Sequence, residues 1–552
     1  MNSYAFWILF MAVIYTVALI VAGNVAKSKA ARGEDFWVGG RKFKPWMVAV
    51  CITGLFSGSS YIAILELAYT TGISAGWYGV AELIHVVIIA LFFVVPFRKR
   101  LVITVSGMIG DRYGRTAKAI AGAVTAFTFP MYATANALAF AAAMSAFTGM
   151  SLSTWVIFSA LLLLIYLQAG GMWSVVFTQT ANTVAFTLMF VIGLVAFFIK
   201  PGLAGLSQLA ATKPAMFGLT TVGLQTILAW FGTFLVNVFL AQAAFQMALS
   251  CRTPEEGQKG LLWAAGFNIV FIVLGVLFGL AAAIVAPGVG RGLVAVPQYL
   301  AQVLPPPLVG IFFMGIWACA LGWGAPCQFS GATSLGRDVA SSLNPGLTDR
   351  QMVSYTKWSL VILTGLMIVF GFLRTEQAAW WNVLAWTARN GATFAPIIGV
   401  LFWPLATRKA AVSALVAGFV SGVAWYHLGG WHPAKFYLNI HPVWIGMIFN
   451  VSALALVTLV EKAGSYRWAI PERGVARSVG LGAIVAGLAL IILAVNQFKW
   501  LYTKGVFGMV LFLIFIAAFC MVITFTREAE ETGLAMEKDR FQGIRAQEKP
   551  VG

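Results

Sequence analysis

The chain consists of apolar runs of about 18 or more residues that recur from one end to the other, separated by short polar loops. Each run is long enough to cross a hydrocarbon core of roughly 30 Å as a helix. About 15 such runs can be counted, and none of the intervening segments is long and polar enough to form a separate soluble domain. The sequence therefore predicts an all-α integral membrane protein whose first partner is the lipid bilayer.

The distribution of charge supports this interpretation. The 552 residues are 60% hydrophobic and 10% charged, with a formal net charge of +18. The basic residues do not form a stripe of the kind that binds nucleic acid, because they lie in short loops, and every second loop is basic. This alternation predicts an odd number of spans, with the N-terminus outside and the C-terminus cytoplasmic. We expect a multi-pass protein of a bacterial plasma (inner) membrane, and the sequence specifies no oligomeric state.

Nothing in the sequence indicates an enzyme. The five cysteines, which lie in or at the ends of apolar segments, have no metal-ligand spacing. We find no HExxH, no GxSxG with partners and no phosphate-binding loop. We therefore expect no catalytic residues, no organic cofactor, and no metal other than a transported sodium ion.

Two apolar spans carry polar and helix-breaking residues in their middle. The second span has Ser57, Ser59 and Ser60 between glycines. Small residues of this kind serve either close helix packing or a broken helix whose freed polar groups line a cavity. The ninth span contains Gly322, Trp323 and then Pro326, which should kink it.

Four motifs resemble those of the sodium/solute symporter family. They are Asp35-Phe-Trp-Val-Gly-Gly-Arg41, Phe56-Ser-Gly-Ser-Ser-Tyr61 followed by Ala68-Tyr69 and Gly72, Gly170-Gly171-Met172 with Thr178, and Thr333 with Arg337-Asp338. They occur in the family's order, and the resemblance covers roughly residues 1–460. It implies a carrier of a small solute that works by alternating access around a site at the membrane midplane.

The resemblance also implies a LeuT-like fold of two inverted five-helix repeats. The expected organisation is an N-terminal helix and cytoplasmic loop followed by two repeats, peripheral helices and a cytoplasmic tail. The corresponding ranges are 1–46, 47–199, 224–405, 406–526 and 527–552.

The family's sodium site is altered in this sequence. The resemblance places its backbone carbonyls at Thr53 and Phe56, and its side-chain ligands in the ninth span at Cys319, Gly322 and Trp323. Glycine has no side-chain oxygen and indole nitrogen is only a donor, so this set suits sodium poorly. A shift in register would restore a hydroxyl such as Ser330. The co-transported ion is therefore expected to be sodium or, given this altered site, a proton.

Four charged or titratable residues lie inside apolar spans, where such residues are costly and usually functional. Glu66, Glu82 and His85 are the candidates for proton coupling, because a carboxylic acid removed from water favours its protonated form. Glu82 and His85 share a helix face and are placed to form a hydrogen bond. Arg389 needs a partner, which would be Glu66, Glu82, Trp386 or the carboxylate of a substrate.

These residues favour a secondary active transporter of a small carboxylate or amino acid over a sugar carrier. The alternative is a transporter-derived solute sensor without coupled transport. The residues expected to bind substrate are Ser57, Ser59, Ser60, Asn237, Gln242, Arg389 and Asn390.

Overall fold

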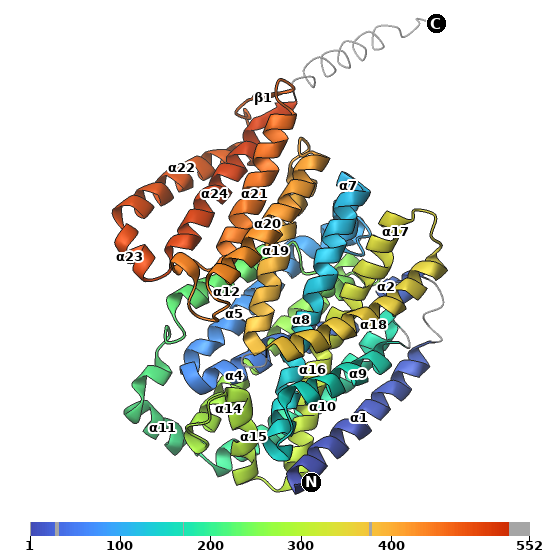
Figure 1. Ribbon diagram of the computed structural model, residues 1–552, viewed down its shortest axis with the longest axis vertical. Helices are drawn as coiled ribbons and strands as arrows, with labels where there is room; N and C mark the ends of the chain where they lie inside the picture. Colours follow the sequence, from blue (N-terminus) through green and yellow to red (C-terminus); the bar gives the residue numbers. More distant parts are fainter. Residues whose placement is uncertain (1, 28–32, 169–170, 375–377, 529–552) are drawn as a thin grey trace, which may run out of the picture.

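The computed structural model describes residues 2–27, 33–168, 171–374 and 378–528 as a bundle of long helices (Figure 1). The helices of the first half are α1 (Ser3–Lys27), α2 (Gly33–Val38), α3 (Pro45–Phe56), α4 (Ile62–Thr71), α5 (Gly76–Ile88), α6 (Val94–Lys99), α7 (Val105–Tyr113), α8 (Arg115–Thr148), α9 (Leu152–Leu167), α10 (Gly171–Ile199), α11 (Gly202–Thr212), α12 (Leu224–Asn237) and α13 (Gln242–Ala248). Those of the second half are α14 (Pro254–Val285), α15 (Gly292–Val303), α16 (Pro306–Thr333), α17 (Ala340–Leu343), α18 (Asp349–Leu373), α19 (Ala378–Phe402), α20 (Arg408–Leu428), α21 (Pro442–Glu461), α22 (Val475–Asn496), α23 (Phe498–Thr503) and α24 (Phe507–Phe525).

Short segments of tighter or wider helix join these elements. The π-helical segments are η2 (Ser57–Tyr61), η4 (Ile89–Phe93) and η6 (Ser334–Val339). The 3-10 segments are η1 (Gly39–Arg41), η3 (Gly72–Ala75), η5 (Pro214–Phe217) and η7 (Tyr437–Asn439).

The predicted number of about 15 spans is not confirmed. Among the described residues, 10 helical stretches are long and apolar enough to cross a membrane, or 11 if the bent pair α12 and α13 counts as one span. One of these stretches, Pro45–Lys99, combines what the sequence analysis treated as two spans. Helices α8 and α19 are 34 and 25 residues long, yet they are not among the 10. Both have largely buried surfaces, so protein rather than lipid surrounds much of their length.

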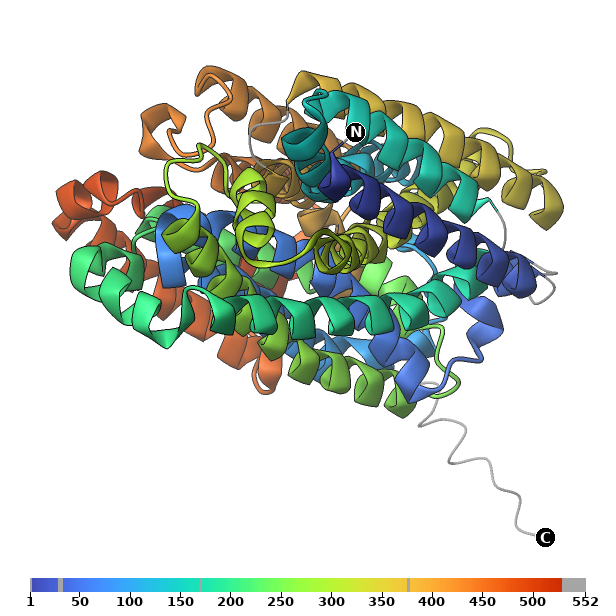
Figure 2. The same cartoon turned by 90° about the horizontal axis from the view of Figure 1, so that it is seen from below.

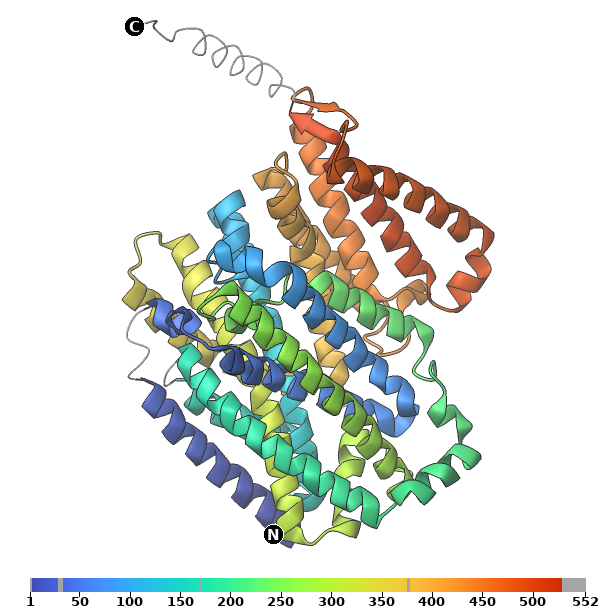
Figure 3. The ribbon, with the colours of Figure 1, turned by 180° about the vertical axis from the view of Figure 1, so that it is seen from behind.

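Helix α16 forms the interior of the bundle, and α22 its margin. In the most apolar window of α16, 83% of residues are buried, against 6% for α22. Helix α16 packs against α8, α10 and α1, and it runs through the middle of the molecule when seen from below (Figure 2). On the opposite face, α14 lies along α3, α4 and α5 (Figure 3). The residues that join α3 to α4 are therefore enclosed by other helices.

The helix break lies at a different place from the one that the sequence suggested. The serine-rich segment at Ser57–Tyr61 does not unwind but continues as the π-helical turn η2. The clear break lies between α12 and α13, whose axes differ by 47°. Pro326 stays within the continuous helix α16. The expected all-α fold is also modified by one small antiparallel sheet of β1 (Tyr466–Trp468) and β2 (Thr526–Glu528).

Helix α19 contains Pro396, and the structure shows how the chain compensates for it. Proline has no N–H, so the carbonyl of Ala392 loses its usual partner four residues on. The side chain of Asn450 on α21 replaces that partner, since its Nδ2 donates to the Ala392 oxygen over 2.7 Å. Asn450 Nδ2 also donates to the Ala414 oxygen, and Asn450 Oδ1 accepts from the Ala395 N–H over 2.6 Å. One fully buried amide therefore ties α19, α20 and α21 together.

The same three helices also meet at glycines. A Cβ built on Gly418 would lie 1.8 Å from the Gly391 oxygen, and one on Gly446 would lie 3.2 Å from the Gly418 oxygen. Because any side chain would clash at the first position, α19 and α20 approach backbone to backbone.

Asn450→Ala is expected to destabilise the protein by about 1–3 kcal/mol, because it leaves buried backbone groups without partners. The measurement is thermal or denaturant unfolding of the purified protein in detergent. The Pro396→Ala background is the control, because alanine restores an N–H at position 396 for the Ala392 carbonyl. The cost of Asn450→Ala should then be smaller, and an equal cost in both backgrounds would contradict this account.

Candidate functional site

A small cavity lies at the centre of the bundle, where seven helices meet. Its volume is about 30 Å³, room for about two water molecules. Helices α3, α5, α8, α12, α13, α16 and α19 contribute to its wall, together with the break between α12 and α13. Among the residues predicted from the sequence, those that line it are Phe56, Glu82, His85, Asn237, Trp323 and Arg389. The structure thus brings together most of the titratable residues found inside the apolar spans.

Glu82 is held on one side of the cavity by two consecutive serines. Its side chain accepts a hydrogen bond from Ser59 Oγ over 2.6 Å and another from the Ser60 hydroxyl. The two serines belong to the π-helical turn η2, which is wider than an α-helical turn. Within it, both hydroxyls point to the same carboxyl group. Glu82 is buried, and within the described part of the chain it has no salt bridge.

Arg389 enters the cavity from α19 without a carboxylate partner among the described residues. Its Nη2 donates to Asn237 Oδ1 and, over 3.5 Å, to Asn390 Oδ1. The guanidinium also lies over the rings of Phe129 and Tyr132, at 5.2 and 5.7 Å from their centres. It is only 4% exposed, and Nε has no hydrogen-bond partner. A buried cation held only by amides and ring faces is incompletely neutralised, so it favours the arrival of an anion.

His85 is connected to Arg389 through Asn237. Because Asn237 Oδ1 accepts from Arg389, its Nδ2 is the donor to His85 Nε2, 3.2 Å away. The proton of the neutral imidazole is then on Nδ1, which has no partner. The sequence predicted a hydrogen bond between Glu82 and His85. In the described structure the two residues bind different partners instead.

Several further polar atoms near this cavity have no protein partner among the described residues. Two of them are Trp323 Nε1 and Tyr132 Oη. Sequence analysis treated α8 as an ordinary span and missed Phe129 and Tyr132. Their spacing of three residues was the available signal, because it places both rings on one face of α8. Phe129 lines the cavity together with Phe234 and Trp386, whose ring centres are 4.6 Å apart. Tyr132 packs behind this wall, 5.7 Å from Trp386 between ring centres.

One residue of the expected ion position, Gly322, is bound by a side chain from another helix. Gly54 on α3 and Gly322 on α16 face each other so closely that a Cβ on Gly322 would lie 2.7 Å from the Gly54 oxygen. A Cβ on Gly54 would lie 2.0 Å from Gln179 Oε1. Gln179 Nε2 donates to the Gly322 oxygen over 2.6 Å, and its Oε1 accepts from Asn182 Nδ2 over 2.9 Å. Gln179 thus presents an amide N–H beside the predicted ion position, where a sodium ion needs oxygen ligands.

Three other predicted residues, Ser57, Asn390 and Glu66, form hydrogen bonds with backbone groups. Ser57 Oγ donates to the Gly54 oxygen of its own helix over 2.7 Å. Asn390 Nδ2 donates to the Thr233 oxygen and so joins α19 to α12. Glu66 accepts the N–H groups of Ala378 and Ala379 at 3.1 and 3.3 Å, where a carboxylate stabilises the start of α19.

Three predicted residues remain to be placed. Cys319 is fully buried on α16, within the contact between α16 and η2. Thr53 Oγ1 has no partner among the described residues. Gln242 begins α13 and faces away from the cavity, as described below.

Comparisons with known proteins show the family to which this chain belongs. The family model described as "Sodium:solute symporter family" matches residues 36–418. The chain belongs to the sodium:solute symporter family. It is accordingly a multi-pass membrane transporter, and it is similar to transporters rather than to enzymes.

The curated relatives are distant. An uncharacterised symporter of Escherichia coli (strain K12), YidK, is 27% identical over 54% of this chain, a match that spans only 56% of that relative. A sodium/glucose cotransporter of Vibrio parahaemolyticus is 22% identical over 73% of this chain and 82% of its own. A sodium/proline symporter of Staphylococcus aureus (strain Newman) is 23% identical over 83% of this chain and 93% of its own.

The fold is shared with a solved structure of a Na+-coupled sialic acid symporter in a substrate-bound outward-open state. The TM-score is 0.68 at 17% identity, covering 83% of this chain and 98% of the other. The LeuT-like fold inferred from the motifs is thereby confirmed.

Exchanging sodium for choline is expected to leave the Tm of the ligand-free protein unchanged to within about 1 °C, because an ion that does not bind adds no stability. Gln179→Glu is the matched variant, since it replaces the donor amide by a carboxylate of the same shape. It should acquire a Tm that rises with sodium concentration. A rise of several degrees in the unsubstituted protein would mean that sodium binds here or elsewhere.

Proposed function

We propose that this chain is a secondary active transporter that carries a small carboxylate, an organic acid or an amino acid, together with a cation. The observation that carries the proposal is the buried Arg389 guanidinium, which has amide and aromatic neighbours but no carboxylate partner in the described structure. Its planar fork matches a carboxylate with two parallel hydrogen bonds. A substrate carboxylate would complete the coordination of Arg389 at its free Nε edge.

A second residue of the cavity wall, Glu82, suits a positive group or a proton. Glu82 receives two hydroxyl hydrogen bonds and has no basic partner among the described residues. An amino acid would place its ammonium toward Glu82 and its carboxylate toward Arg389. An organic acid would leave Glu82 to take up a proton. Among the relatives, a transporter named for proline fits this pair of charges better than one named for glucose.

Transport requires the cavity to open, because about 30 Å³ holds only water. The aromatic side chains of Phe234, Trp323 and Trp386 form much of its wall. Their rearrangement would admit the solute, in keeping with alternating access around a central site.

The coupling ion is proposed to be a proton carried by Glu82 rather than sodium at the usual position. Gln179 supports this choice, because its amide already binds the Gly322 carbonyl. Glu66, the other acidic candidate, binds the first N–H groups of α19 and does not line the cavity.

A solute sensor without coupled transport is the second candidate, and the lack of side-chain oxygens at Gly322 and Trp323 favours it. The two functions separate in proteoliposomes. A transporter accumulates labelled solute, whereas a sensor binds the same solute in detergent but shows no uptake.

Carboxylate ligands are expected to raise the Tm of the purified protein, and Arg389→Gln should abolish the effect, because the substituted amide carries no charge. The panel is L-proline, lactate and glucose, with glucose expected to be inactive. Arg115→Gln, on the exposed start of α8, is the control that should keep the response. Carboxylate stabilisation that survives Arg389→Gln would exclude Arg389 as the anion site.

Glu82→Gln is expected to remove the dependence of uptake on an imposed pH gradient, since glutamine cannot carry a proton. Initial uptake rates in proteoliposomes with and without the gradient measure this. Glu66→Gln is the matched acid-to-amide control and should keep the dependence, with a lower Tm from the weakened start of α19. If Glu82→Gln shows the same response to the gradient as the unsubstituted protein, proton coupling through Glu82 is wrong.

A further inference from the structure

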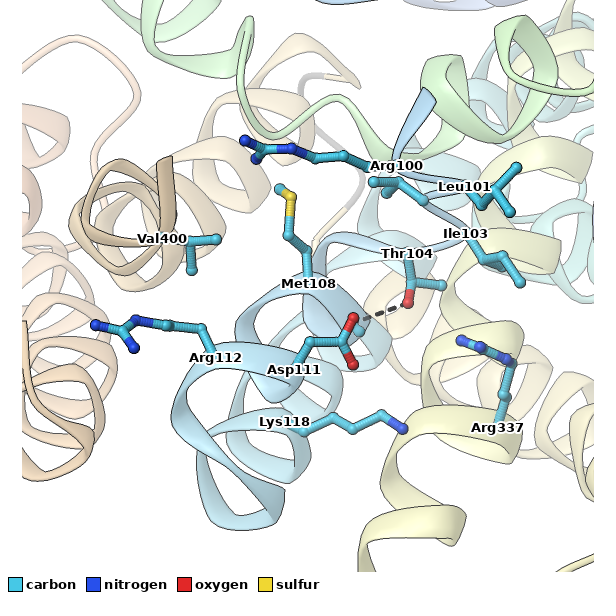
Figure 4. Close-up of a pocket in the computed structure, with 12 residues that line it drawn as sticks. Arg100, Leu101, Ile103, Thr104, Met108, Asp111, Arg112, Lys118, Arg337 and Val400 are labelled. Carbon is cyan, nitrogen blue, oxygen red and sulfur yellow. Dashed lines mark hydrogen bonds between the residues drawn. The ribbon is translucent and has the colours of Figure 1, made fainter. Parts of the chain in front are cut away.

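A second hollow lies away from the central cavity, beside the basic segment that joins α6 to α8. Its volume is about 340 Å³. Arg100, Arg112, Lys118 and Arg337 line it, with Asp111 as the one acidic residue among its lining. Figure 4 shows these side chains arranged around Met108 and Thr104, with Arg100 and Arg112 on one side and Lys118 and Arg337 on the other. The hollow is thus a cationic basin in a protein with few charged residues.

Two of the basic residues of this basin, Lys118 and Arg337, are paired with a buried carboxylate. Asp338 is fully buried and lies next to Arg337 in the π-helical segment η6. It is 2.8 Å from Arg337 Nη1 and 3.9 Å from Lys118 Nζ. Its other oxygen accepts a hydrogen bond from Ser106 Oγ on α7 over 2.7 Å. The acidic residue of the Arg337-Asp338 motif therefore connects two basin residues to the interior.

The hydrogen bonds continue inward from Ser106. Ser106 Oγ is 3.3 Å from Ser334 Oγ, and Ser334 Oγ is 2.8 Å from Gln242 Nε2. Gln242 Nε2 also donates to the Ser330 oxygen over 3.1 Å, while its Oε1 accepts from the Val105 N–H over 3.0 Å. The side chains of Ser106, Ser330, Ser334 and Gln242 are all buried.

Gln242 lies where this network meets the central cavity. It is the first residue of α13, directly after the break that bends the α12–α13 pair by 47°. Its neighbours Ala241 and Ala243 both line the central cavity. A file of hydrogen-bonded side chains thus runs from the cavity wall to the cationic basin through Gln242, Ser334, Ser106 and Asp338.

We propose that the basin is the cytoplasmic vestibule of the transport path, and that the hydrogen bonds of Gln242 to α7 and α16 form the closed inner gate. This rests on the proposed transport function and on the basic loops facing the cytoplasm. Polar residues are costly within a membrane protein and are concentrated along its pathways. The bonds of Gln242 join a broken helix to two others, so opening toward the basin must break them. Arg100 and Arg112, which have no carboxylate partner in the described structure, would then receive the carboxylate as it leaves.

The test measures access to the central cavity from the cytoplasmic side. Ala243→Cys is introduced into a full-length variant whose five native cysteines are replaced, and everted membrane vesicles are treated with a membrane-impermeant maleimide. Gln242→Ala is expected to raise the labelling rate of this cysteine about tenfold, because the closed state loses several hydrogen bonds. Ser334→Ala, a smaller change, should raise it in the same direction.

Gln328→Ala is the matched control. Gln328 is a buried glutamine on α16 that faces α18 instead of the file, and its change should leave the labelling rate unaltered. If the cysteine-free protein does not fold, Ala243→Cys is added to the native chain and the labelling of the native chain is subtracted. An unchanged rate in both Gln242→Ala and Ser334→Ala, or an equal rise in Gln328→Ala, would overturn the proposal.

The readout needs no substrate, so it is independent of what the protein carries. A failed gate leaves the carboxylate site of Arg389 intact. Conversely, loss of the carboxylate response would leave the labelling result standing.

Discussion

A backbone that crosses a bilayer must satisfy its own N–H and C=O groups, and this constraint explains where the chain places its amides. At three places where a helix is interrupted or two backbones come very close, a buried carboxamide binds a backbone group. Asn450 binds the carbonyl freed by Pro396. Gln179 binds the Gly322 carbonyl beside the close approach of α3 and α16. Gln242 binds the Val105 N–H next to the break between α12 and α13. The departures from regular helix and the polar side chains are thus parts of one arrangement.

The central cavity is subject to a similar constraint, because charged groups buried in a membrane protein also need partners. A carboxyl and a guanidinium are kept at different walls of a closed central cavity, each held by neutral donors or acceptors. Full mutual neutralisation would stabilise the empty protein but leave nothing for a ligand to complete. The incomplete coordination of Arg389 is consistent with a cost that a bound anion would relieve.

The sequence was informative where a residue type is energetically unfavourable in an apolar span. Charged residues in apolar runs identified Glu82, His85 and Arg389, all three of which line the cavity. Family motifs led to the correct fold. The sequence did not reveal partners, because these depend on contacts between helices far apart in the chain: Glu66 binds the start of α19, 312 residues away, and Gln242 binds Ser334 rather than facing the cavity. The π-helical turn at Ser57–Tyr61 could not be predicted from the sequence either, because serine and glycine are equally compatible with a break, a packing face and a widened turn.

The glycine contacts of α19 with α20 and α21 have a mechanical consequence. Where backbones touch through Gly391, Gly418 and Gly446, there is no deformable side chain to absorb a displacement. Sliding of α19 on α20 would bring these backbones into collision, so we expect α19, α20 and α21 to move together. Arg389 lies two residues before Gly391, so we expect its position in the cavity to follow the tilt of all three helices.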